Sequence, residues 1–212
     1  MKRRGVVFSC GSLKLEGIYF DPESHGSVPA VVVCHPHPLY GGSMRNNVTY
    51  AIAGALAEVT IAALLFNFRG VGKSQGSFGG GSTEQQDVEA ALGWLSDQNG
   101  VEREKLGLAG YSFGGGVALP VACRDARVKG IALISPYFES SPSGLLKTCS
   151  KPKLIIGGGS DSMVLASQVS SYGQDAEEPK QVEIIEGPDH FWSGYEDVMA
   201  RKVAGFFSEI LK

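Results

Sequence analysis

A serine between two glycines is the residue of this chain best placed for covalent chemistry. Ser112 stands in Gly-Tyr-Ser-Phe-Gly at residues 110–114, after the apolar run Leu106–Ala109 and before a small-residue helical pattern, Val117–Cys123. A strand, a sharp turn and a helix around such a motif present a serine hydroxyl at the carboxyl end of a sheet. We expect a strained backbone at the serine. The amide of Phe113 then lies at a helix start, where unpaired N–H groups favour negative charge.

A serine hydroxyl needs a base to take its proton, and the base needs an acid to orient it. Of the four histidines, His190 follows the last predicted strand, from which its loop can swing over the sheet edge to the serine. Asp161 follows an earlier strand and three glycines, which allow the tight turn that brings its carboxylate to His190. We prefer Asp161 to Asp189, whose carboxylate would struggle to reach the adjacent imidazole, and to Asp175. The predicted order is nucleophile Ser112, acid Asp161 and base His190.

The negative charge that develops during acyl transfer needs at least two N–H donors. The amide of Phe113 is one of them. The loop His35–Asn47 supplies the other, and we predict the amide of His37, because the prolines on either side of it have no N–H and stiffen the backbone. The amides of Leu39 and Tyr40 are the alternatives.

Large side chains in the predicted loops are candidates to line an apolar substrate cleft beside the serine. The candidates are Tyr40, Phe113, Tyr137, Phe138, Met163 and Trp192.

Other motifs suggest different sites, and we reject them. His35 and His37 could share a face toward a metal, but no third ligand stands nearby, so we expect their rings to fix the loop by hydrogen bonds. The stretch Gly70–Ser74 suggests a phosphate loop, but that motif requires glycine where Asn67 stands. No dinucleotide fingerprint follows the first parallel strand. We therefore expect no metal and no cofactor, and we interpret Arg69 as a buried tie between loops.

Apolar runs alternate with helical patterns along the chain, and these elements must position the site. The expected strands are 5–9, 13–20, 29–34, 61–68, 105–109, 128–134, 154–156 and 182–185. The expected helices are 46–58, 83–97, 114–124, 164–172 and 194–211. The first two strands form an antiparallel hairpin, and the later apolar runs are typical of parallel strands buried on both faces. The sequence therefore predicts a three-layer α/β/α sandwich with a mostly parallel, twisted sheet and ligands at its carboxyl edge.

The bulk composition sets the broader limits. The 212 residues, 43% hydrophobic with a formal net charge of −3, fit one globular domain over 1–212 and offer nucleic acid no basic face. No apolar run is long enough to span a bilayer, and Val6–Phe8 is too short for a secretory signal. The four cysteines fit no metal-ligand spacing, so we expect free thiols in a reducing cytoplasm. The oligomeric state stays open.

These motifs together resemble the α/β-hydrolase superfamily over nearly the whole chain. The nucleophile motif, the acid Asp161 and the base His190 match it, and Phe66–Ser74 resembles its arginine-glycine turn. More narrowly, His35–Gly42 and Gly187–Phe191 resemble small serine hydrolases without a cap. That group is akin to dienelactone hydrolases, and its members are often labelled carboxylesterases.

The resemblance implies a carboxylic ester hydrolase with a small-molecule substrate. Dienelactone hydrolases proper use cysteine where this chain has Ser112, so their own activity does not carry over. The short connection 136–150 implies that no lid is inserted, which suits small soluble acyl esters. The same triad could instead cleave a thioester, a peptide end or a carbon–carbon bond beside a carbonyl, since the cleft selects the bond. A binding protein that has lost turnover is a further alternative, against which the intact triad argues.

Overall fold

The sheet is the element that brings the candidate residues together. The structure, a computed structural model, describes residues 1–138 and 143–212. Its strands are β1 (Lys2–Cys10), β2 (Leu13–Asp21), β3 (Val28–Cys34), β4 (Ala62–Phe66), β5 (Val101–Tyr111), β6 (Val128–Ile134), β7 (Lys153–Gly158) and β8 (Lys180–Ile185). They form one sheet in the order β1-β2-β4-β3-β5-β6-β7-β8. β1 pairs antiparallel with β2 and β2 with β4, and the remaining neighbours are parallel, as predicted.

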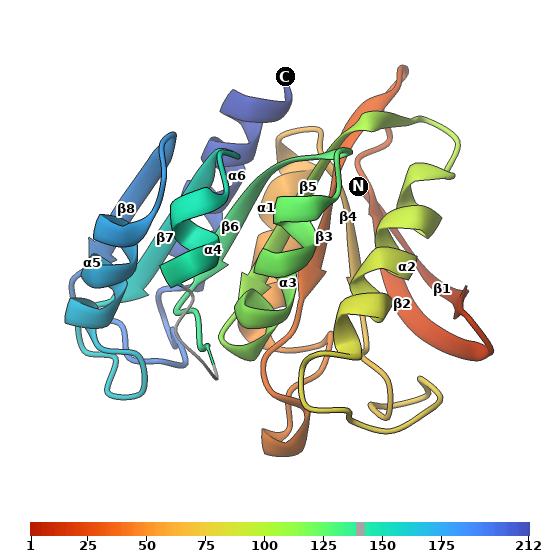
Figure 1. The fold of residues 1–212 in the computed structure, drawn as a ribbon. Helices are drawn as coiled ribbons and strands as arrows, with labels where there is room; N and C mark the ends of the chain where they lie inside the picture. Colours follow the sequence, from red (N-terminus) through yellow and green to blue (C-terminus); the bar gives the residue numbers. More distant parts are fainter. Residues whose placement is uncertain (139–142) are drawn as a thin grey trace.

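Helices cover both faces of the sheet and complete three layers (Figure 1). The helices are η1 (Pro38–Tyr40), α1 (Asn47–Glu58), α2 (Glu84–Ser96), α3 (Phe113–Arg124), α4 (Ser143–Thr148), α5 (Ala166–Asp175) and α6 (Glu196–Leu211). Helices α1 and α6 pack on one face, and α2, α3, α4 and α5 contribute to the core on the other. The predicted three-layer α/β/α sandwich is therefore confirmed.

The side chains of β3 alternate between the two faces of the sheet, and this explains why its residues are apolar throughout. Val31 and Val33 belong to the core on the α1 and α6 side, and Val32 to the core on the opposite side. Successive side chains of a strand point to opposite faces, so a strand covered by helices on both faces must be apolar at every position.

Two elements differ from the prediction in ways that have a physical reason. β5 begins at Val101, four residues before the predicted 105–109 segment, because Val28 pairs with Val101 across the strands. The exposed charged residues within 102–105 concealed that extension. Helix α4 was not predicted, because Leu146 is buried while Leu145 is 39% exposed, so the helix has no apolar stripe.

The carboxyl ends of the parallel strands gather at the lower edge of the sheet in Figure 1. Between β6 and β7 the described residues form only the short α4. Residues 139–142 of the expected connection 136–150 lie outside the described part. Within the described part, no helix combines the length and the hydropathy that crossing a membrane would require.

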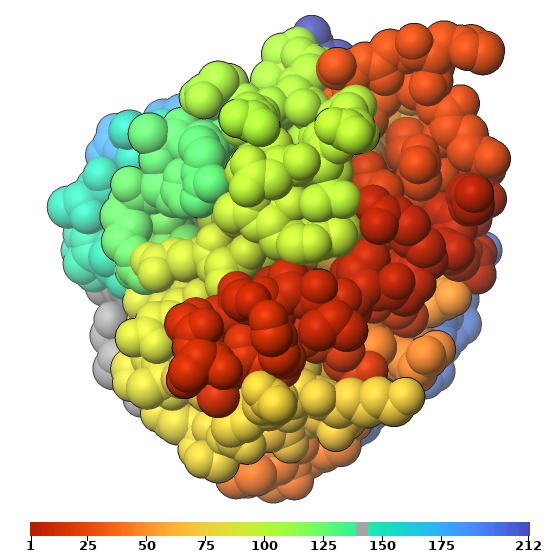
Figure 2. Space-filling model, turned by 90° about the vertical axis from the view of Figure 1, so that its right-hand side faces the viewer, coloured from red at the N-terminus to blue at the C-terminus, as the bar shows by residue number. Residues whose placement is uncertain are grey.

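The antiparallel hairpin of β1 and β2 forms the side edge of the sheet, with β8 at the opposite side. Figure 2 looks onto that edge, where β1 and β2 (red) lie between α2 (yellow-green) and the loop after β4 (yellow). Lys14 and Gln75 join the hairpin to the loop, since each accepts a hydrogen bond from the backbone N–H of the other, at 2.8 and 2.9 Å.

Candidate active site

Ser112 lies at the turn between β5 and α3, in the strained conformation predicted for it. Its backbone has φ 53° and ψ −122°, a combination that residues with a side chain adopt at a cost. The turn also needs its glycines. A Cβ on Gly110 would lie 2.4 Å from the carbonyl oxygen of Gly114, and a Cβ on Gly114 would lie 2.4 Å from that of Cys34. The close approach of these backbones holds the serine at the carboxyl end of β5.

The structure brings Ser112, His190 and Asp161 into one hydrogen-bonded chain. His190 Nδ1 lies 2.8 Å from Asp161 Oδ2, and His190 Nε2 lies 3.1 Å from Ser112 Oγ. Because a carboxylate only accepts, Nδ1 carries the proton, and the lone pair of Nε2 accepts the serine hydroxyl. The three residues are 7%, 5% and 3% exposed for Ser112, His190 and Asp161, so little water competes for these bonds.

Backbone amides keep Asp161 ionised. Its Oδ1 accepts hydrogen bonds from the N–H groups of Met163 and Val164, at 2.9 and 2.8 Å. Burial alone would raise the pKa of Asp161, but the hydrogen bonds from His190 and from these amides outweigh it and lower the pKa. A carboxylate in this state orients the imidazole and stabilises a positive charge on it.

Asp189 has a structural role beside the candidate base. Its Oδ1 accepts the backbone N–H groups of Phe191 and Trp192, at 2.9 and 3.1 Å, and so closes the turn that carries His190. Asp175 pairs with Lys147 at 3.4 Å. The structure therefore joins Asp161, rather than Asp189 or Asp175, to the His190 ring.

Tyr111 is a residue of this site that sequence reasoning missed. Its hydroxyl donates to the carbonyl oxygen of His190 at 2.6 Å and fixes the backbone of the His190 loop. Burial, reinforced by the charges of Asp161 and Asp189, raises its pKa, so the hydroxyl stays a donor. The only signal in the sequence was a polar group in a buried strand beside Ser112.

Two residues that line the pocket, Phe113 and His37, have backbone N–H groups without an acceptor among the described residues. Phe113 opens α3, so its N–H has no partner within the helix. His37 lines the pocket above Ser112, and its N–H makes no hydrogen bond to a described residue. The alternatives are engaged, since the N–H groups of Leu39 and Tyr40 donate to His37 Nδ1 and His37 O, at 3.2 and 3.1 Å. His37 therefore stays our prediction for the second donor.

A pocket of about 630 Å³ opens above Ser112. Three predicted cleft residues line it with exposed surface, namely Tyr40 at 86%, Tyr137 at 47% and Met163 at 59%. Phe191, which we did not predict, also lines it at 59% exposure. The described lining is thus mainly apolar and aromatic, with Ser112 at its base.

The prediction that Trp192 lines the cleft is wrong. Its ring is fully buried, and its Nε1 donates to Ser135 Oγ at 3.1 Å. The left-handed turn at Trp192, with φ 60°, directs the indole into the core and leaves Phe191 on the cleft side. Phe138 lies outside the pocket too, packed edge-on against Tyr172 with ring centroids 5.1 Å apart.

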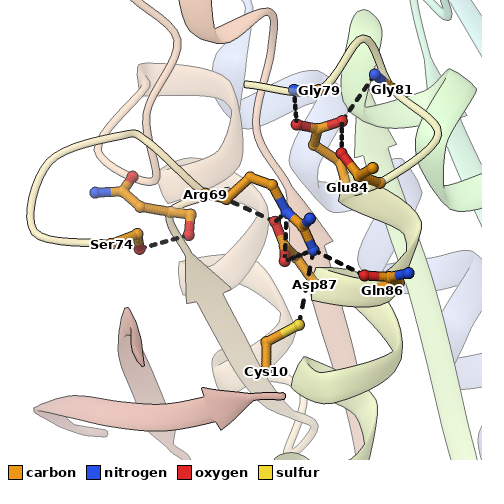
Figure 3. A network of polar contacts seen from close by, with 10 residues as sticks. Cys10, Arg69, Ser74, Gly79, Gly81, Glu84, Gln86 and Asp87 are labelled. Atoms are coloured by element: carbon orange, nitrogen blue, oxygen red, sulfur yellow. Dashed lines mark hydrogen bonds and ion pairs between the residues drawn. The ribbon is translucent and has the colours of Figure 1, made fainter. Parts of the chain in front are cut away.

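A second polar network, around Arg69, lies after the carboxyl end of β4, at the same edge of the sheet (Figure 3). The Arg69 guanidinium pairs with Asp87 at 2.7 Å, and the Arg69 backbone N–H donates to the same carboxylate at 2.9 Å. The buried Glu84 carboxylate accepts the backbone N–H groups of Gly79 and Gly81, each at 2.7 Å. Arg69 therefore ties the loop after β4 to helix α2, where we predicted a tie between loops.

Proteins of known structure share this fold. An α/β serine hydrolase homologue from Coxiella burnetii superposes with a TM-score of 0.86 at 30% identity, over 97% of both chains. An α/β serine hydrolase without a lid from Xanthomonas campestris gives a TM-score of 0.83 at 28% identity, over 100% of this chain and 96% of its own. An uncharacterized protein of Rickettsia prowazekii is 35% identical over 195 residues, 88% of this chain and 81% of its own.

Fold and relatives define the class of protein as an α/β-hydrolase without a lid, and the chain is a hydrolase of the α/β serine type. Within this superfamily the chain belongs to the family described as X-Pro dipeptidyl-peptidase (S15 family), which matches residues 13–148. That stretch contains Ser112 and ends before Asp161 and His190.

Proposed function

We propose that this hydrolase cleaves carboxylic esters of small acyl substrates through an acyl-enzyme formed on Ser112. The observation that carries the proposal is the hydrogen-bonded chain from Ser112 through His190 to Asp161, with the serine end open to an apolar pocket. A hydroxyl bonded to the lone pair of a neutral imidazole can lose its proton as it attacks a carbonyl.

In the first half of the reaction, Ser112 Oγ attacks the acyl carbonyl and its proton passes to His190 Nε2. The Asp161 carboxylate stabilises the imidazolium and itself stays ionised. The carbonyl oxygen becomes negatively charged and accepts hydrogen bonds from the amides of Phe113 and His37. Collapse of this intermediate breaks the ester bond, and His190 returns the proton to the departing alcohol.

In the second half, water replaces the alcohol. His190 Nε2 takes a proton from the water as its oxygen attacks the acyl-enzyme carbonyl, and the same two amides hold the second oxyanion. Collapse releases the acid and returns the proton to Ser112 Oγ. The cycle consumes one ester and one water and yields one acid and one alcohol.

The pocket lining supports an apolar acyl group of modest size. Tyr40, Tyr137, Met163 and Phe191 offer aromatic and thioether surface, which favours burial of hydrocarbon from the substrate. The free thiols of the four cysteines support a cytoplasmic setting for this chemistry.

The test is a substrate panel with the wild-type protein and Ser112→Ala. We expect hydrolysis of short p-nitrophenyl esters and loss of kcat by roughly 10³- to 10⁶-fold in the variant. A fluorophosphonate probe should label the wild type on Ser112, as located by mass spectrometry. Unchanged hydrolysis in Ser112→Ala would refute the proposal.

The same panel separates the other bonds that such a triad can cleave. Matched thioesters, a dienoate product of ring cleavage and an Xaa-Pro p-nitroanilide each report a different scissile bond. The last of these is the activity named in the description of the matched family. One result would replace the ester with another scissile bond. The probe would label Ser112, and kcat/KM for one of these substrates would be higher than for any ester.

A further inference from the structure

His35 is a buried histidine that the proposed reaction does not use directly. It follows β3, is fully buried, and both of its ring nitrogens are engaged. Nδ1 lies 2.6 Å from the carbonyl oxygen of Pro36, and Nε2 accepts the backbone N–H of Phe68 at 3.1 Å. The first bond requires a proton on Nδ1 and the second a lone pair on Nε2, so the ring is neutral and held in one tautomer. Burial, which lowers its pKa to about 4, is consistent with this state.

The carbonyl that His35 binds belongs to the same peptide unit as the N–H of His37. The peptide between Pro36 and His37 is trans, so its C=O and N–H point in opposite directions. Because the oxygen is held toward the His35 ring, the N–H is directed away from that ring. His37 itself lines the pocket above Ser112.

Gly42 holds the same carbonyl from another side. A Cβ on Gly42 would lie 2.1 Å from Pro36 O, so only glycine leaves the oxygen its place. The N–H of Gly42 also donates to His37 O at 3.1 Å, which ties down the next carbonyl along the chain. The orientation of the peptide is thus determined by the His35 ring and the Gly42 backbone together.

The His35 backbone also contacts the helix that supplies the first N–H donor. A Cβ on Gly114, the residue after Phe113, would lie 2.6 Å from His35 O. The first turn of α3 therefore packs directly on the chain that leads to His37. The backbone of His35 thus lies against Gly114, the residue after the first candidate donor, and its ring bonds the peptide of the second.

We propose that His35 is a positioning residue that holds the His37 amide in the oxyanion site through the Pro36 carbonyl. The inference rests on the proposed ester hydrolysis. It gives His35 a role in that reaction without contact to the substrate. A misdirected donor weakens the bond to the oxyanion in the transition state and leaves binding of the ground-state ester unchanged. We therefore expect loss of the His35 bond to lower kcat and to leave KM unchanged.

Two substitutions of His35 each keep one of the two hydrogen bonds of its ring and remove the other. The amide nitrogen of His35→Asn lies near the position of Nδ1 and can still donate to Pro36 O. The amide oxygen of His35→Gln can reach the position of Nε2 and accept the Phe68 N–H, but the bond to Pro36 O is lost. With p-nitrophenyl butyrate we expect His35→Gln to lose roughly 10- to 100-fold in kcat with little change in KM, less than removal of a donor costs. His35→Asn should stay within a few-fold of the wild type.

His25→Gln, an exposed histidine changed in the same way, is the matched control and should behave as the wild type. Gly42→Ala tests the same peptide without touching the ring, because its methyl group displaces Pro36 O. Gly54→Ala is its control, since nothing lies within 4 Å of a Cβ there. We expect Gly42→Ala to lose kcat and Gly54→Ala to retain it.

Binding of an alkylboronic acid provides a readout that a loss of folding would not imitate. The boronate forms a tetrahedral adduct on Ser112 with an oxygen where the oxyanion develops. In folded His35→Gln its inhibition constant should rise in parallel with the loss of kcat, while the affinity for the carboxylic acid product stays constant.

Equal losses in His35→Asn and His35→Gln, or a rise in KM at constant kcat, would overturn the role of the Pro36 bond. If His35→Gln fails to fold, Gly42→Ala against Gly54→Ala decides the question. A wild type that neither hydrolyses esters nor is labelled on Ser112 removes the proposed function, and this inference with it. An active wild type with unchanged kcat in His35→Gln and Gly42→Ala removes this inference alone.

Discussion

Two buried polar networks lie at the same edge of the sheet, and they differ in one respect that governs what each can do. In the network at the end of β4, Asp87 is paired with a permanent cation, Arg69, at 2.7 Å. In the network at the ends of β5 and β7, Asp161 is bonded at 2.8 Å to His190, which is neutral until it takes a proton. The Arg69 guanidinium keeps its protons, whereas the imidazole of His190 can accept one from Ser112.

The two networks also differ in how far solvent reaches them. The Glu84 and Asp87 carboxylates are fully buried, and backbone amides or a guanidinium occupy their oxygens. Ser112 lies at the base of a pocket of about 630 Å³. A polar network whose carboxylates are buried and paired stabilises loops, and one that ends in a hydroxyl at a pocket can perform chemistry.

The largest expected effect is on turnover, from Asp161→Asn. The amide keeps the size of the side chain but no longer stabilises an imidazolium, and it favours the wrong imidazole tautomer. We expect kcat to fall roughly 10⁴-fold, as loss of a triad acid does elsewhere. Stopped-flow and steady-state assays with p-nitrophenyl butyrate measure it, and circular dichroism shows that the fold is retained. A loss below tenfold would mean that Asp161 does not assist His190.

The matched change in the other network is Asp87→Asn, where we expect the opposite pattern. Removal of one partner leaves the Arg69 guanidinium, with only 11% of its side chain exposed, beside a neutral amide. The free energy of unfolding should drop by about 3–5 kcal/mol, the cost of breaking a buried pair from one side. Urea unfolding measures it. If kcat per folded molecule fell as far as in Asp161→Asn, the comparison between the two networks would fail.

The third effect is a pH dependence of stability that originates at His35, which bonds to Phe68 beside one network and to Pro36 beside the other. Burial lowers the pKa of His35 from 6.5 to about 4. Between these values the unfolded chain binds a proton that the folded chain does not, so stability is complete above pH 6.5 and is lost as the pH falls toward 4.

The size of that loss is about 3 kcal/mol, from the energy of one pKa unit. The measurement is the unfolding free energy of wild type and His35→Gln at pH 7, 5.5 and 4. The difference between the two proteins should shrink as the pH falls. A constant difference would show that the ring does not titrate on unfolding.

The smallest effect is expected at the pocket wall, with Phe191→Ala. This side chain is 59% exposed and lines the pocket rather than the core. We expect KM for p-nitrophenyl hexanoate to rise by roughly 3- to 10-fold with unchanged kcat, since about 1 kcal/mol of apolar contact is lost. Trp192→Phe is the contrast, because it removes the bond to Ser135 inside the core and should lower stability while KM stays the same.

Local signals were enough to predict most of the elements and the candidate catalytic residues. Val31 to Val33 are apolar at successive positions because both faces of β3 are covered, and that pattern is visible in one dimension. Ser112 was recognisable because a strained turn between a strand and a helix requires small neighbours on both sides. Asp161 and His190 followed from their places after strands of a parallel sheet, whose carboxyl ends meet at one edge.

Side-chain direction in irregular loops could not be predicted in this way. Trp192 and Phe191 are adjacent aromatic residues, and the left-handed turn at Trp192 decides which of them faces the cleft. The hydroxyl of Tyr111 meets the carbonyl of His190 across 79 positions of sequence, through a fold that no local pattern encodes.

The amino-acid sequence alone thus predicts the order of most strands and helices and the candidate catalytic side chains, because periodicity and turn chemistry act over a few neighbouring residues. The tertiary structure alone decided the distances, the tautomers and the direction of each loop side chain. These depend on which distant backbones approach one another, as Pro36 O approaches both the His35 ring and Gly42, and packing resolves such contacts only when the whole sheet is assembled.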